Sequence, residues 1–361
     1  MVRVAGIDPG TGSFDICCLD NGKLCAEFSV PTEEVAKNPE VITKALKRLA
    51  PLDLVVGPSG YGLPLTPISK VGEHELELLT LIRPEERGVG SKLGVRPLVR
   101  RLGEEGLKVY FIPGVKHLPT VPVHRKINRI DMGTPDKVCS VALSIYDQAH
   151  RLSLSFNSTS FILAELGLGF NAYIGVEGGT IVDGIGGTLG GTGFLSSGGM
   201  DTQLAYLLGG FSRDLLFQGG AAYAADLKSR TPEELAERRE EEQCQMALEN
   251  LMESIERGVL SLKVSVRKPR EILLSGRLTR VEELYAEAVE RLSRYGDVRR
   301  IEGFASEVKE AAQGAALLAD GLAGGSHRDL VDCLQLREAR GSALDHIYLS
   351  GVDGLRRIFH V

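Results

Sequence analysis

The sequence has no stripe of lysine and arginine interleaved with aromatic residues, and its formal net charge is −6. A nucleic-acid partner is therefore not expected, because such partners select a clustered positive surface. No apolar run approaches the roughly 18 residues of a membrane span, and the first residues have the pattern of a strand rather than of a signal peptide. We therefore expect a protein of the cytoplasm with no membrane partner.

The six cysteines are scattered along the chain, and none of them forms a C-x-x-C pair. This spacing argues against a zinc site and predicts reduced thiols in the core. Hydrophobic residues make up 43% of the chain and charged residues 25%, as in an ordinary globular protein. A chain of 361 residues is too long for one simple core, so we expect two domains.

Glycine is abundant, with 43 residues, and the most informative glycines stand near the start, in the run Asp8-Pro9-Gly10-Thr11-Gly12-Ser13. A short apolar strand leads into this run and a second one leaves it. Backbone N–H groups in such a turn converge on one point, and glycine lets a phosphate approach without a Cβ clash. The aspartate at the strand end could hold a hydrated Mg²⁺ beside that phosphate. The alternative is an ordinary hairpin turn, for which the same residues are suitable.

The rest of the chain repeats one plan. Residues 2–30 have the pattern of a three-stranded meander, followed by a helix over 34–49, a strand over 52–57 and a strand over 108–113. Between these two strands, 58–107 has the character of an insertion that could cover a substrate. A helix is predicted over 136–149, with Thr134 as its N-cap and Pro135 at its first position.

A second meander follows at 158–166, 171–176 and 180–185. It is followed by helices over 201–208 and 232–257, a strand over 271–274, a helix over 281–295, a strand over 298–301 and an alanine-rich helix over 306–323. The pattern predicts an α/β protein of two duplicated domains, each β-β-β-α-β-α-β-α, with a nucleotide cleft between them. We place the domains at 1–150 and 151–361.

The sequence resembles the actin-like ATPase superfamily, which includes actin, chaperone ATPases, sugar kinases and acetate kinases. Five landmarks carry the resemblance in order: residues 8–13 as a first phosphate loop, 136–149 as a first connecting helix, 165–170 as a second phosphate loop, 272–277 as an adenosine motif, and 311–319 as a second connecting helix. The resemblance implies that the two domains are ribonuclease-H-like, and it implies ATP and Mg²⁺ as ligands.

The residue roles that the resemblance implies follow the motifs. The resemblance implies that Asp8 and Glu165 bind the metal. It implies that the phosphates and the nucleoside contact Gly10, Thr11, Gly12, Ser13, Gly167, Gly169, Ser275, Gly276 and Arg277. For Glu165 the plain alternative is a solvated carboxylate at a strand end.

Two further stretches narrow the resemblance. Residues 182–201 look similar to the glycine-rich stretch of acetate and butyrate kinases, and 133–137 resemble the Gly-x-Asp-Arg motif of type III pantothenate kinases, whose aspartate is thought to act as a base. The chain departs from acetate and butyrate kinases at Asp8, where they carry asparagine, and at Glu165, where they carry histidine. The nearest group is an archaeal uncharacterised family described as predicted butyrate kinases.

The acceptor is expected near the loop 117–136, which carries Arg129, Asp131 and Asp136 as candidate catalytic residues. An arginine could bind a carboxylate or a phosphoryl group, and an aspartate could act as base if the acceptor is a hydroxyl. Asp136 could equally be a first-turn carboxylate favoured by the helix dipole. We expect a kinase for a small metabolite, most simply a short carboxylate, and possible homodimers. The alternative is an ATP-binding regulator or slow ATPase that acts on a protein partner.

Overall fold

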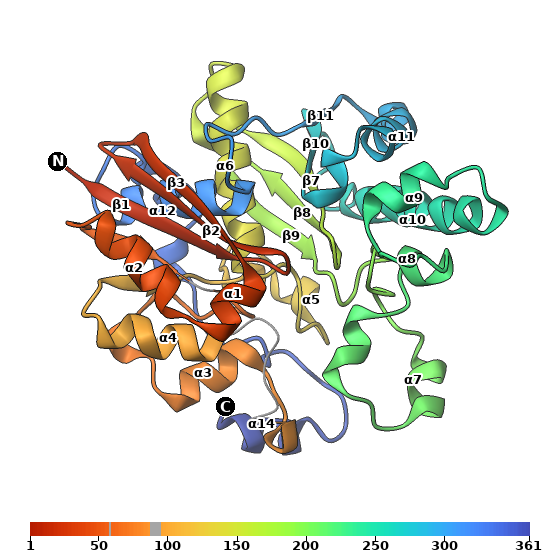
Figure 1. The fold of residues 1–361 in the computed structure, drawn as a ribbon, viewed down its shortest axis with the longest axis horizontal. Coiled ribbons are helices and arrows are strands. Elements are labelled where there is room, and N and C mark those ends of the chain that lie inside the picture. Colours follow the sequence, from red (N-terminus) through yellow and green to blue (C-terminus); the bar gives the residue numbers. More distant parts are fainter. Residues whose placement is uncertain (58, 87–94) are drawn as a thin grey trace. The chain divides into compact units, whose positions relative to one another are not determined.

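The computed structural model describes residues 1–57, 59–86 and 95–361, and the chain divides into two compact units (Figure 1). Unit 1 comprises Met1–Ile130, Thr134–Ser158 and Glu302–Val361, and unit 2 comprises Asp131–Gly133 and Thr159–Ile301. The predicted boundary lies at 150, whereas the chain passes from unit 1 to unit 2 after Ser158 and back to unit 1 at Glu302. The difference is that Glu302–Val361 packs with unit 1 rather than with unit 2.

Unit 1 is built on a six-stranded sheet in the order β3-β2-β1-β4-β6-β5. Its strands are β1 (Arg3–Pro9), β2 (Ser13–Asp20), β3 (Lys23–Pro31), β4 (Leu54–Val56), β5 (Thr66–Pro67) and β6 (Val109–Phe111). The first three strands form an antiparallel meander, and β4 and β6 continue the sheet parallel to β1. Parallel neighbours place the carboxyl ends of β1, β4 and β6 at one edge, where ligands bind in open α/β sheets.

Nine helices accompany this sheet in the described part of unit 1. They are α1 (Thr32–Lys37), α2 (Glu40–Arg48), α3 (Glu73–Thr80), α4 (Val95–Glu104), α5 (Val123–Lys126), α6 (Pro135–Arg151), α12 (Glu310–Leu322), α13 (Arg328–Cys333) and α14 (Val352–Phe359). The helix expected over 34–49 is two helices, because Asn38 and Pro39 separate α1 from α2. The expected insertion, 58–107, carries α3 and α4, while residues 58 and 87–94 of it lie outside the described residues.

Unit 2 repeats the same sheet plan with five strands in the order β11-β10-β7-β8-β9. They are β7 (Ser160–Leu166), β8 (Asn171–Glu177), β9 (Thr180–Ile185), β10 (Glu271–Ser275) and β11 (Val298–Arg300). The meander β7-β8-β9 is antiparallel, and β10 and β11 extend the sheet parallel to β7. The order matches β6-β4-β1-β2-β3 strand for strand, which confirms the predicted duplication.

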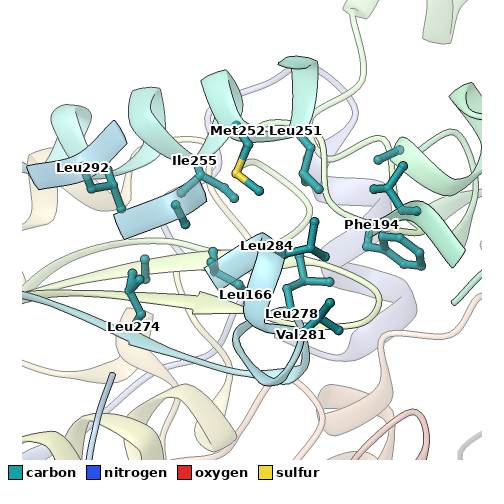
Figure 2. Packing of buried hydrophobic residues seen from close by; sticks show 14 of the residues in the cluster. Leu166, Phe194, Leu251, Met252, Ile255, Leu274, Leu278, Val281, Leu284 and Leu292 are labelled. Carbon is teal, nitrogen blue, oxygen red and sulfur yellow. The ribbon is translucent and has the colours of Figure 1, made fainter. Parts of the chain in front are cut away.

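The helices of unit 2 are α7 (Thr202–Leu208), α8 (Ala221–Ala224), α9 (Pro232–Glu237), α10 (Glu242–Leu262) and α11 (Glu282–Leu292). The sequence predicted a single helix over 232–257, whereas the structure has two helices there, α9 and α10. Figure 2 shows how α10 places Leu251, Met252 and Ile255 over the core, which also takes up Leu166 from β7 and Leu274 from β10. The charged residues of α10 therefore share the helix with a buried stripe.

The helix α12 explains why the C-terminal segment belongs to unit 1. A Cβ on Gly6 of β1 would lie 2.2 Å from the backbone N of Ala316, and a Cβ on Gly314 would lie 1.8 Å from the carbonyl O of Cys139 in α6. The two glycines thus allow α12 to cross β1 and α6 at backbone contact. None of the helices in the described ranges is long and apolar enough to cross a membrane.

Candidate functional site

The turn between β1 and β2, residues 10–13, is closed by its own backbone. The N–H of Gly10 donates to the carbonyl O of Ser13 at 2.9 Å. Thr32 fixes the turn from α1, since its hydroxyl donates to the carbonyl O of Gly10 at 2.7 Å and its N–H to that of Gly12 at 3.1 Å. Thr11 and Gly12 are exposed. The turn is therefore held by its carbonyls, with Thr11 and Gly12 accessible to a ligand.

Lys309, the residue just before α12, reaches this turn from the other end of the chain. Its Nζ lies 2.6 Å from Asp8 Oδ2 and 3.8 Å from Asp15 Oδ2, and it donates to the carbonyl O of Ser13 at 3.0 Å. A Cβ on Gly10 would lie 2.2 Å from Nζ, so glycine at this position makes room for the ammonium. The sequence interpretation missed Lys309.

Asp15 fixes the start of α12 in place. Its Oδ2 accepts the backbone N–H of Lys309 at 2.8 Å, and its Oδ1 accepts the hydroxyl of Ser29 at 2.8 Å. Asp15 is 1% exposed. An aspartate inside an otherwise apolar strand was the one sequence signal for a buried cation nearby, because a buried carboxylate needs a partner.

The charges around Asp8 act on one another. Burial raises the pKa of Asp8, with the ammonium of Lys309 opposing the shift and the charge of Asp136 adding to it. Burial alone would lower the pKa of Lys309, but Asp8 and Asp15 outweigh it, so that pKa is raised. The ammonium is thus retained at neutral pH as the counter-charge of a buried acidic cluster.

A small cavity opens where β1, β4 and β6 end. Its polar wall is formed by Asp8 and by Asp136, which lies in the first turn of α6. Gly57 and Ser59, which follow β4, also line the cavity. The remaining lining residues are apolar: Ile7, Pro9, Ile112, Pro135, Cys139 and Ala311. Two sequence-predicted residues, Asp8 and Asp136, are therefore brought to one cavity at the carboxyl edge of the sheet.

The side chain of Asp136 is held at both oxygens. Thr134 Oγ1 donates to Oδ1 at 2.5 Å, and Lys137 Nζ lies 2.5 Å from Oδ2. Burial opposes ionisation of this carboxyl, but Lys137 and Thr134 outweigh burial and the pKa of Asp136 is lowered. Asp136 is thus an ionised group at neutral pH and a weak base, since an efficient general base has a pKa near the working pH.

The donor set of the cavity fits magnesium delivered with a nucleotide. Mg²⁺ binds through one or two carboxylates while keeping several waters, rather than in an all-protein cage. Asp8 supplies one carboxylate, whereas both oxygens of Asp136 are already engaged by Thr134 and Lys137. No group of three or more candidate ligands occurs among the residues that the structure describes. Lys309 already engages one oxygen of Asp8, so a metal would meet Asp8 at the other oxygen or through water.

The loop 117–130 is pinned within unit 1. The buried Lys116 donates to the carbonyl O of Ala343 at 2.6 Å and also to that of Arg129, while the buried Lys126 donates to the carbonyl O of Leu118 at 2.8 Å. Arg129 does not line the cavity. Both lysines thus hold the loop in place. The candidate arginine, Arg129, contributes its backbone carbonyl to this network.

Asp131 belongs to unit 2, where it ties two loops together. Its carboxylate accepts the N–H of Gly133 at 3.0 Å and the N–H of Thr188 at 3.3 Å. A Cβ on Gly186 would fall 1.8 Å from Asp131 Oδ1, so the glycine-rich loop needs glycine there to admit the carboxylate. This position supports a structural role for Asp131.

The second predicted phosphate loop lies between β7 and β8 in unit 2. Gly167 N–H donates to the carbonyl O of Phe170 at 3.0 Å, and the carbonyl O of Gly169 accepts the N–H of Ser196 at 2.9 Å. The turn thus repeats the self-closing geometry of residues 10–13. Glu165, at the end of β7, is paired in register with Ser275 at the end of β10.

The predicted adenosine motif begins at Ser275. This residue is fully buried, and its Oγ has no hydrogen-bond partner within the described parts of the chain. Gly276 has φ +93°, and a Cβ there would lie 2.5 Å from the carbonyl O of Leu166, so only glycine fits. Arg277 forms an ion pair with Glu233 of α9. Ser275, Gly276 and Glu165 are thus neighbours at one edge of the unit 2 sheet.

Comparisons with known proteins agree with this architecture. A family model described as "Protein of unknown function (DUF1464)" matches residues 6–349. No curated protein sequence matches the chain significantly. Among solved structures, a propionate kinase from Francisella tularensis subsp. tularensis SCHU S4 is similar with a TM-score of 0.62 and 12% identity, covering 88% of this chain and 98% of the other.

Two further structures are similar. An acetate kinase from Entamoeba histolytica has a TM-score of 0.58 and 12% identity, covering 81% of this chain and 87% of its own. A candidate N-acetylmannosamine kinase from Listeria monocytogenes, Lmo2764, has a TM-score of 0.52 and 13% identity, covering 87% of this chain and 97% of its own. At these identities the likeness establishes the fold, which is the duplicated actin-like fold expected from the sequence.

Proposed function

The chain belongs to the DUF1464 family, and we propose that it is an ATP-dependent phosphotransferase acting on a small metabolite. One observation carries the proposal: the 10–13 turn, the Asp8–Lys309 ion pair and Asp136 converge at the carboxyl edge of the unit 1 sheet. Phosphoryl transfer depends on positioning and charge neutralisation, with little covalent participation by the protein. A turn with accessible N–H groups can position the phosphates, and the fixed ammonium beside it can neutralise their charge.

Within unit 1, the exposed Thr11 and Gly12 would donate N–H groups to phosphate oxygens, with the hydroxyls of Thr11 and Ser13 beside them. Lys309 would contribute positive charge where charge develops on the transferred group. Mg²⁺, when bound with the nucleotide at Asp8, would neutralise phosphate charge. From unit 2, Glu165 stays a predicted metal ligand, and Gly167, Gly169, Ser275, Gly276 and Arg277 stay predicted nucleotide contacts.

A short carboxylate is the acceptor that we favour. Such an acceptor is already deprotonated at neutral pH and needs no base, which suits the lowered pKa of Asp136. Solved structures of the same fold include kinases named for acetate and for propionate. Arg129 and Asp131 are not needed for this chemistry in unit 1.

A hydroxyl acceptor is the second candidate, because Asp136 faces the same cavity as Asp8 and could accept a proton there. The substitution Asp136→Asn separates the two acceptors. With a carboxylate acceptor we expect turnover to fall by less than about 10-fold, because no proton is moved. With a hydroxyl acceptor we expect a loss of about 10² to 10⁴-fold, the usual contribution of a general base.

The test of the proposal is product analysis with Mg-ATP and a panel of acetate, propionate, butyrate, sugars and pantothenate. We expect one acceptor class to be phosphorylated and Asp8→Ala to abolish turnover while circular dichroism stays unchanged. Asp20→Asn, at the opposite end of β2, is the matched control and should keep full activity. Unchanged turnover in Asp8→Ala would refute the mechanism. ATP hydrolysis that no acceptor accelerates would favour the regulator alternative.

A further inference from the structure

Two cysteines of unit 1 meet across the β2–β3 hairpin, away from the cavity. Cys18 lies on β2 and is fully buried, whereas Cys25 lies on β3 and is exposed. Their sulfur atoms are 2.9 Å apart. A disulfide bond is about 2.05 Å long, so bond formation requires the two sulfurs to approach by less than about 1 Å.

A β-bulge produces this contact. Cys18 pairs in register with Ala26, and the next residue, Leu19, pairs with Leu24. Cys25 is therefore the extra residue on β3, set opposite the step between Cys18 and Leu19. Bulges re-aim a side chain relative to the regular pleat. Cys17 precedes Cys18 on the same strand, so its side chain is on the other face of the sheet.

We propose that Cys18 and Cys25 are a redox-active thiol pair that closes to an intrachain disulfide by exchange with a low-molecular-weight disulfide such as oxidised glutathione. Two cysteine thiols are oxidised to one disulfide, and one glutathione disulfide is reduced to two glutathione thiols. The proposal concerns the hairpin alone and does not depend on the proposed phosphotransfer.

The order of events follows from exposure. Cys25 gives up its proton and its thiolate attacks one sulfur of the glutathione disulfide, which breaks the S–S bond and releases the first glutathione, as its thiol once protonated. Cys18 then gives up its proton and attacks Cys25 Sγ, releasing the second glutathione. Cys18 is unsuited to the first step, because it is fully buried and a glutathione disulfide in solution cannot reach its sulfur.

The bond would fasten β3 to β2 at the end of the hairpin far from the 10–13 turn and lock the register of the bulge. The bond would close a short loop that runs from Cys18 to Cys25. Closing a loop of this size should raise the midpoint of thermal unfolding of unit 1 by about 5 °C.

The test uses the full chain in glutathione buffers of increasing oxidised fraction, read by mass spectrometry of non-reduced tryptic peptides. Cleavage after Lys23 separates peptide 4–23, with Cys17 and Cys18, from peptide 24–37, with Cys25. We expect these two peptides to become cross-linked in the wild type and in Cys17→Ser, and to stay separate in Cys18→Ser and Cys25→Ser. Cys18→Ser should accumulate glutathione on Cys25, because the resolving thiol is gone.

Three results would overturn the proposal: no cross-link in the oxidised wild type, a wild type that stops at glutathione-bound Cys25, or a cross-link that disappears in Cys17→Ser. If Cys18→Ser fails to fold by circular dichroism, Cys18→Ala replaces it, and the wild-type peptide map with Cys17→Ser still decides between the outcomes.

Discussion

Replacing Lys309 by methionine tests the ion pair at the centre of the candidate site. Asp8 is 6% exposed, and the Lys309 side chain is 28% exposed. Removing one partner of a buried pair leaves an uncompensated buried charge and costs about 3–5 kcal/mol. Because Lys309 is partly exposed, water can reach Asp8 in the variant, so we expect the lower end, about 3 kcal/mol.

Hydrogen–deuterium exchange of peptides from β1, β2 and α12 is the suitable assay, since it reports the stability of unit 1 separately from unit 2. A loss of about 3 kcal/mol corresponds to exchange about 100-fold faster at amides that exchange through global opening of the unit. Peptides from β7 and β8 are the internal reference. Lys44→Met is the matched control: its pair with Glu40 is 3.1 Å long but both side chains are exposed, so we expect less than about 0.5 kcal/mol.

The double variant Asp8→Asn/Lys309→Met decides whether an unpaired buried charge causes the loss of stability in Lys309→Met. Converting the carboxylate to an amide removes the stranded charge, so unit 1 should recover to within about 1 kcal/mol of the wild type. If the double variant exchanges as fast as Lys309→Met, the loss comes from the packing of the lysine stem. An effect of Lys309→Met no larger than that of Lys44→Met would refute the reasoning.

Two further predictions concern packing and pH. Gly314→Ala should destabilise unit 1 by about 1–3 kcal/mol in urea unfolding because its Cβ would strike the backbone of Cys139, whereas Gly354→Ala, open within its helix, should stabilise by about 0.5–1 kcal/mol; equal effects would contradict the close crossing. Burial lowers the pKa of His117 to about 4 from an ordinary 6.5, so the unfolded chain takes up its proton first as the pH falls. The wild type should therefore lose up to about 3 kcal/mol more than His117→Gln between pH 7 and pH 4, and parallel stability curves would show that the histidine is not buried neutral.

Local patterns in the sequence were sufficient for the repeated meander. Short apolar runs bounded by glycine turns predict β1, β2, β7 and β8, because run length and turn chemistry are set by neighbouring residues. The turn at 10–13 and the loop at 165–170 were located for the same reason. The start of the helix that carries Asp136 was located because a proline and a cap residue mark it.

Contacts between distant segments could not be obtained in this way. Asn38 and Pro39 break a helix that periodicity alone extends through them, and the packing of α12 against Gly6 moves the C-terminal segment into unit 1. The Lys309 side chain reaches Asp8 because the backbone of α12 is anchored by Asp15 and because Gly10 leaves space. The sequence by itself determined where a tight glycine turn joins two strands, since a turn is local. Only the tertiary structure decided which charges surround that turn, because burial and pairing of charges depend on residues brought together from both ends of the chain.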